Sequence, residues 1–225
     1  MKFLSTFVFL LAIFSNIYAQ EIDAYDSLSI NQIDTNYAHN FGFTIGGGVS
    51  FPVINPIFTD TFSNWRTEPG SLISIGMLYN SNLNKQLSLQ CGLILNFTKI
   101  PIFFTINNNL NIKKITNYSS LAIPFFASYK LNQKKKGLFF TFGAQAELDI
   151  SKKIDKDNRM FPLKAFVPEL YSAVGYKFNN IFSIYELRMF WQIIPINILK
   201  LDNEIYSHAL ASLIIWRTGI LFTIR

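Results

Sequence analysis

Apolar and polar residues alternate strictly along one stretch of the chain, from Leu87 to Phe97. The odd positions of this stretch are all apolar: Leu87, Leu89, Cys91, Leu93, Leu95 and Phe97. The even positions are mostly polar or small: Ser88, Gln90, Gly92, Ile94 and Asn96. A period of two predicts a β-strand with one apolar face and one mostly polar face.

The same alternation recurs in seven other stretches. Their apolar positions start near Phe41, Ile73, Leu121, Leu138, Leu170, Tyr185 and Ile214. The sequence therefore predicts about eight strands.

The connections between these stretches are alternately long and short. The long ones are residues 52–70, 99–116, 151–165 and 194–206, and the short ones are residues 80–84, 132–136 and 179–180. A soluble β-sandwich also alternates along its strands, but outer-membrane barrels combine long outer loops with short periplasmic turns. We therefore predict an all-β fold, a closed antiparallel up-and-down transmembrane β-barrel. The loops around Asn64, Asn109 and Asp157 are expected outside the cell, and the turns around Asn82, Lys135 and Asn179 in the periplasm.

The first 40 residues lack this alternation. Met1 and Lys2 precede an apolar run to Phe14, and the small residue Ala19 follows, which is the plan of a secretory signal peptide. We predict a signal peptide at residues 1–19, a flexible periplasmic N-terminal segment at residues 20–40, and the barrel domain at residues 41–225. The expected location is the bacterial outer membrane, with the N-terminus in the periplasm.

Composition narrows the class further. Half of the residues are hydrophobic and 16% are aromatic, yet no window after the leader holds 18 consecutive apolar residues, which argues against a helical membrane protein. The single Cys91 provides no disulfide framework. The net charge of +6 is expected to reflect loop and turn lysines beside anionic lipid headgroups. An exported chain has no nucleic acid as partner.

Charged residues occupy the polar face of several predicted strands. They are Lys130, Glu147, Asp149, Glu169, Lys177, Glu186, Arg188 and Arg217. An eight-stranded barrel has room inside only for side chains, so these charges would point inward and pair with one another. We expect Arg188 or Arg217 to pair with Glu169 or Glu186. Two interpretations remain: a plugged, structural interior, or a narrow gated pore or small-ligand cavity.

The residues give little support to an enzyme. His39 and His208 are the only histidines, and Ser212 lies about 13 Å from His208 along one strand, beyond hydrogen-bond reach. His39 could approach a serine from another strand. Two distant histidines and one cysteine make a weak metal site. We predict a non-enzymatic protein without metal or cofactor.

Four strand patterns resemble the Bacteroidota outer-membrane β-barrel family of the PorT type. The segment YSSLAIPFFASYKL at residues 118–131 carries Leu121, Ile123, Pro124, Tyr129 and Lys130 at the positions of the family's fourth strand. GLFFTFGAQAELDI resembles its next strand, and SAVGYKF and SIYELRMFW resemble its sixth and seventh. The resemblance covers residues 41–225 and departs from the usual pattern at the end, where Arg225 stands in place of a terminal aromatic residue.

The resemblance implies an integral cell-envelope barrel, in some members tied to type IX secretion or gliding, with no catalytic residues. Its expected partners are outer-membrane lipid and lipopolysaccharide, the barrel assembly machinery during insertion, and other envelope or secretion proteins. The function expected from the sequence is that of a structural or secretion/adhesion-accessory element acting through extracellular loops.

Overall fold

The computed structural model of the chain describes residues 39–56, 62–106, 110–131, 136–151, 163–179, 184–194, 196–198 and 210–225. The predicted signal peptide and nearly all of the predicted N-terminal segment lie outside these residues and stay predictions. The first strand begins at His39, two residues before the predicted start of the barrel.

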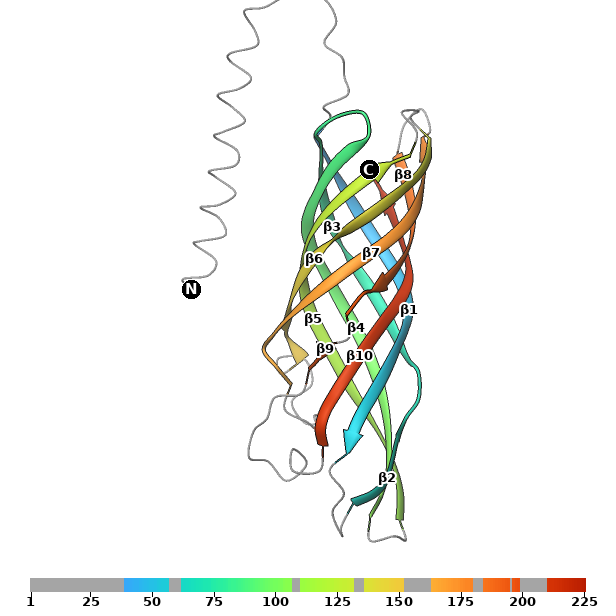
Figure 1. Cartoon of the computed structure of the whole chain (residues 1–225), viewed down its shortest axis with the longest axis vertical. Coiled ribbons are helices and arrows are strands. Elements are labelled where there is room, and N and C mark those ends of the chain that lie inside the picture. The colour runs from blue at the N-terminus through green and yellow to red at the C-terminus, as the bar shows by residue number, and fades with distance from the viewer. Residues whose placement is uncertain are drawn as a thin grey trace, which may run out of the picture. The chain divides into compact units, whose positions relative to one another are not determined.

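Eight antiparallel strands close into a ring (Figure 1). The ring consists of β1 (His39–Pro56), β3 (Gly70–Asn82), β4 (Leu87–Ile106), β5 (Leu110–Lys130), β6 (Gly137–Asp149), β7 (Phe166–Asn179), β8 (Ile184–Gln192) and β10 (Leu210–Ile224). They follow one another in chain order, and β10 pairs with β1 from Ile224 opposite Phe43 to Leu210 opposite Pro56. The predicted closed up-and-down barrel of about eight strands is confirmed.

Two further strands lie within connections that the sequence predicts to be long loops. β2 (Phe62–Thr67) pairs with the far end of β4. β9 (Ile196–Asn197) pairs with β10. Along β10, the pairing with β8 reaches Thr218, and β9 then takes up the pairing at Ile215 and Ile214.

The prediction of a long loop at residues 99–116 is wrong. β4 continues to Ile106 and β5 begins at Leu110, so that the two strands form one long hairpin. The alternation persists here with its phase reversed, because the inward Ile100 is apolar and buried while the outward Lys99 is charged and exposed. The sequence pattern identifies strands by apolar residues at their outward positions. In this part of the hairpin the apolar residues are at the inward positions, so the pattern does not identify the strand. Figure 1 shows β2, β4 and β5 reaching beyond the ends of β1 and β10.

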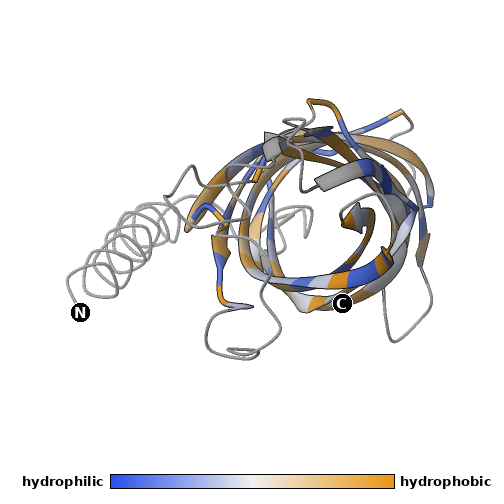
Figure 2. Ribbon diagram, turned by 90° about the horizontal axis from the view of Figure 1, so that it is seen from below, coloured by the Kyte–Doolittle hydropathy of each residue, from blue (hydrophilic) through white to orange (hydrophobic). Residues whose placement is uncertain are grey.

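Elsewhere in the ring, the outer face is apolar and the inner face is largely polar. Exposed outward side chains include Phe41, Phe43, Ile45, Met77, Leu93, Phe125, Phe142, Met189 and Ile220. Buried inward side chains include Thr44, Asn80, Gln90, Thr141, Glu186 and Arg217. Figure 2 shows the change of residue type that underlies this, with orange and blue segments following one another along the strands of the ring.

The two ends of the barrel differ. β1 begins and β10 ends beside the short turn at residues 83–86, since His39 pairs with Ser81 and Ile224 pairs with Phe43. We call this the turn end, and the opposite one, from which the β4–β5 hairpin projects, the loop end. In the part of the chain that the structure describes, no helix has the length and apolar character needed to cross a membrane.

Candidate functional site

The candidate site is the charged interior of the barrel. Of the eight charged residues singled out from the sequence, six are buried there: Glu147, Glu169, Lys177, Glu186, Arg188 and Arg217. Lys130 and Asp149 are half-buried. The six divide into two groups at different heights. Each group holds one pair of the kind expected from the sequence, because Arg188 lies beside Glu186 and Arg217 beside Glu169.

The central group consists of one arginine between two carboxylates. Arg217 of β10 donates from Nη1 to Glu147 Oε1 of β6 at 2.7 Å. The same nitrogen lies 3.4 Å from Glu169 Oε1 of β7. Charge-assisted hydrogen bonds of this kind are about twice as strong as neutral ones, and they join three strands across the interior.

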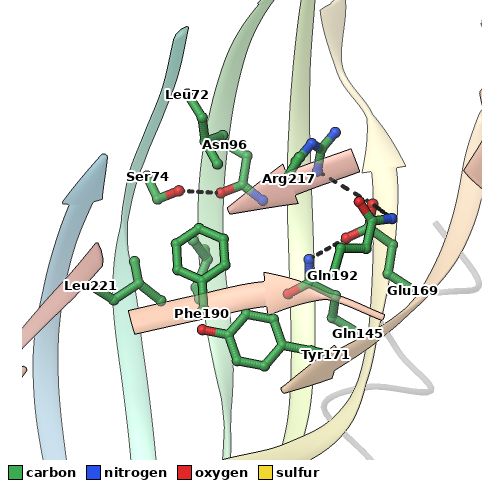
Figure 3. Close-up of a pocket in the computed structure, with 11 residues that line it drawn as sticks. Leu72, Ser74, Asn96, Gln145, Glu169, Tyr171, Phe190, Gln192, Arg217 and Leu221 are labelled. Atoms are coloured by element: carbon green, nitrogen blue, oxygen red, sulfur yellow. Dashed lines mark hydrogen bonds and ion pairs between the residues drawn. The ribbon is translucent and has the colours of Figure 1, made fainter. Parts of the chain in front are cut away.

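Amide and hydroxyl side chains complete the central group (Figure 3). Gln145 donates from Nε2 to Glu169 at 2.6 Å, and Gln192 donates to the other oxygen of Glu169 at 3.1 Å. On the opposite wall, Asn96 donates to Glu147 at 2.7 Å, and its own Oδ1 accepts a hydrogen bond from a serine of β3. The sequence placed Gln145 and Asn96 on the polar face, but nothing in the alternation indicated that they solvate carboxylates.

The turn-end group surrounds a single carboxylate. Glu186 accepts hydrogen bonds from Arg188 at 2.5 Å and from Arg225 at 3.0 Å, and Lys177 lies 3.7 Å from its other oxygen. Arg225 is the member that sequence reasoning missed, because its place at the end of the last strand drew notice only as the lack of an aromatic residue. Lys130 is close enough to act electrostatically on Lys177.

Aromatic rings separate the two charged groups. Phe126 stacks on Tyr171 with centroids 4.4 Å apart, and Tyr171 stacks on Phe190 at 5.4 Å. Leu72, Ala173 and Leu221 are buried in the same cluster. Glycine makes room for the rings, since a Cβ on Gly219 would lie 2.8 Å from the Phe190 ring.

A second apolar layer fills the interior at the loop end. Its buried members are Ile100, Ile102, Phe104, Tyr118, Leu163, Val167, Ile198, Leu213 and Ile215. Tyr118 also lies beneath the guanidinium of Arg217, whose Cζ is 5.2 Å from the ring centroid. From turn end to loop end, the interior therefore alternates between charged and apolar layers.

A small cavity lies among these side chains. A cavity of about 20 Å³ beside Arg217 is lined by parts of the central group and of the aromatic layer, as Figure 3 shows. A volume of roughly 10–15 Å³ is needed for one water molecule, so this cavity suits a water rather than a metabolite.

The described residues offer few candidates for a catalytic or metal-binding site. Asp149 accepts hydrogen bonds from the backbone and hydroxyl of Ser151, near the loop end of β6. No group of three or more His, Cys, Asp or Glu residues that could hold a metal ion occurs within the described ranges. The side chains of His39 and His208 lie outside them, so the prediction of a non-enzyme stays a prediction.

No protein-family model matches the chain, and no curated protein matches it. Among solved structures, it is similar to the outer membrane protein OprG from Pseudomonas aeruginosa. The TM-score is 0.44 and the identity 10%, with 84% of this chain and 99% of that chain covered.

Proposed function

We propose that this protein is an integral barrel of the bacterial outer membrane whose interior is filled by side chains. It acts as a structural or secretion/adhesion-accessory element through its loop end, and it neither conducts solutes nor catalyses a reaction. The observation that carries the proposal is the arrangement of the closed ring, with apolar side chains outside and charged layers inside.

The outer face supports insertion into a membrane. A closed ring of strands satisfies every backbone hydrogen bond within the wall, which is the condition for crossing a lipid bilayer with strands. Phe43, Phe125 and Met189 are each about half exposed or more on the outside, from three separate parts of the wall. A soluble barrel would turn such residues inward, and only lipid makes this outer face favourable.

The interior supports a sealed barrel. The stacked rings of Phe126, Tyr171 and Phe190 lie on the turn-end side of the central charges, and the apolar layer around Tyr118 lies on the loop-end side. Water and ions passing along the axis would have to displace both layers. The charged residues serve to bind the strands together across the lumen, as the structural interpretation of the sequence expects.

Reconstitution of the purified chain tests this function. We expect an unboiled sample to migrate faster than a boiled one in detergent gels, as closed membrane barrels do, and to give no conductance steps in a planar bilayer. Stable steps would instead favour the narrow pore or ligand-conducting barrel. Failure to insert into bilayers at all would rule out the membrane barrel itself.

The finer assignments rest on sequence patterns. The resemblance of residues 118–131 and of the three later strands to PorT-type barrels supports a Bacteroidota source and an accessory role in secretion. The leader pattern supports export with a periplasmic N-terminus, insertion by the barrel assembly machinery, and contact with lipopolysaccharide. A strain that lacks the chain tests the role: the intact chain should restore surface secretion or adhesion, and a chain whose β4–β5 hairpin is shortened above Lys99 should not.

A further inference from the structure

The outward apolar side chains of the ring, such as Leu93, Phe125 and Met189, form an apolar band around the wall. The outer wall carries a row of cations where the β4–β5 hairpin leaves this band. Arg66 of β2, Phe103 of β4 and Lys113 of β5 are opposite one another in the registers of neighbouring strands, so all three side chains share the outward face. The Arg66 guanidinium lies 4.7 Å from the centroid of the Phe103 ring, and the Lys113 ammonium lies 5.0 Å from it. The aromatic ring thus holds one exposed cation from each of the two neighbouring strands.

Lys99 lies on the same outward row of β4, between these cations and the apolar band. The row reads Leu93, Leu95 and Phe97 within the band and then changes to Lys99, which is exposed. Glu68 is the exposed carboxylate nearby, with its backbone nitrogen bonded to the Pro101 carbonyl. Among the described residues 62–68 and those of the outward row of the β4–β5 hairpin, three cations therefore stand against one carboxylate, and this part of the surface is positive.

The heights of these cations above the band differ. Lys99 is two residues beyond Phe97, about 7 Å along the strand, and Phe103 is six residues beyond it, about 20 Å along. With strands tilted by about 35–45°, the cations lie roughly 5 and 15 Å above the last apolar residue. The headgroup region of a phospholipid bilayer adds only about 5–8 Å on each side.

We propose that Lys99, Arg66 and Lys113 form a binding site on the outer wall for a phosphate-bearing glycolipid of the outer leaflet. Its acyl chains lie against the apolar band below Phe97, and Lys99 binds a phosphate at the membrane surface. Arg66 and Lys113, held over Phe103, bind phosphates on the sugars that reach higher. A phospholipid headgroup reaches Lys99 alone, which is why the two levels of charge select a glycolipid. The site rests on the proposed membrane insertion.

Titration of the reconstituted full chain, followed by native mass spectrometry, tests the site. The probes are a rough-type lipopolysaccharide with its phosphates, the same glycolipid with its phosphates removed, and phosphatidylglycerol. Each surface cation contributes about a fivefold change in affinity for an anionic lipid. Arg66→Gln/Lys113→Gln should weaken binding of the phosphorylated glycolipid about 25-fold and leave phosphatidylglycerol within a factor of about two. Lys99→Gln should weaken both lipids about fivefold.

A matched control removes two exposed lysines at the turn end. Lys85→Gln/Lys136→Gln changes the net charge by the same amount, and it should leave glycolipid affinity within a factor of about two. Equal weakening by the control pair, or equal binding of the dephosphorylated glycolipid, would overturn the site, as would displacement by inorganic phosphate at matched phosphate concentration. Heat-modifiable migration of every variant reports insertion separately, so loss of the site is distinguishable from loss of the barrel.

Discussion

Arg217 and Glu147 are joined by a 2.7 Å hydrogen bond although they belong to strands that are not neighbours in the wall. β7 and β8 stand between β6 and β10, so the bond crosses the interior of the barrel. Both side chains are almost completely buried. The bond therefore links distant parts of the wall across the lumen, and it is not a pair between neighbouring strands.

Removing this cross-lumen hydrogen bond should destabilise the barrel. In Arg217→Ala, the carboxylates of Glu147 and Glu169 face each other without their shared cation, and breaking a buried pair in this way costs about 3–5 kcal/mol. Urea unfolding of the reconstituted protein measures the loss. Adding Glu147→Gln to the same chain removes one uncompensated charge and should recover part of the lost free energy of unfolding. An unchanged urea midpoint in Arg217→Ala would show that these charges line a wetter space instead of closing the barrel.

The aromatic layer should act as the seal. Phe126 is 2% exposed, and Phe126→Ala removes the end of the ring stack at a cost of about 3–5 kcal/mol. The inserted variant should show conductance in planar bilayers, because the missing ring leaves a gap in the apolar layer between the two charged groups. The adjacent Phe125 is 59% exposed on the outer face, so Phe125→Ala should remain closed and lose only the contact of the ring with lipid, about 1.5–3 kcal/mol. Conductance from both variants alike would argue against a seal made by the stack.

The edge of the apolar band can be located with arginine substitutions on one strand. Phe125→Arg places a charge on the lipid-facing wall and should cost about 2–4 kcal/mol if the position is near mid-bilayer. Ile115 is also outward on β5, opposite Pro101 and above the band, and Ile115→Arg should cost about 0–1 kcal/mol. Folding titrations into vesicles compare the two. Equal tolerance of arginine at both positions would favour a soluble barrel with a solvated wall.

The loop end should face outside the cell. In a Cys91→Ser background, Glu68→Cys lies at the loop end and Lys85→Cys in the turn at the opposite end, and both parent residues are exposed. An impermeant maleimide should label the first on intact cells and the second only after the outer membrane is permeabilised. Reversed labelling would invert the orientation, and the glycolipid site would then face the wrong leaflet.

The local alternation of apolar and polar residues was sufficient to predict the fold class. The period of two in residues 87–97 and its seven repeats indicates strands, and a barrel wall in lipid requires apolar residues on its outer side. The same rule failed at residues 99–116, where β4 and β5 continue past the band. There the inward side of the strand is apolar, as Ile100 shows. The run of outward apolar residues therefore ends at Phe97, although the strand continues.

The sequence by itself determined that charged residues such as Glu186 and Arg217 occupy the inner face, because side-chain direction in a strand depends only on whether a position is odd or even. Which of them meet was decided by the tertiary structure. Partners such as Arg217 and Glu147 depend on strand register, on the closure of β1 against β10 and on the width of the lumen, and none of these is encoded within a single strand. The separation of the charges into two groups by the rings of Phe126, Tyr171 and Phe190 likewise arises only when all eight strands surround one interior.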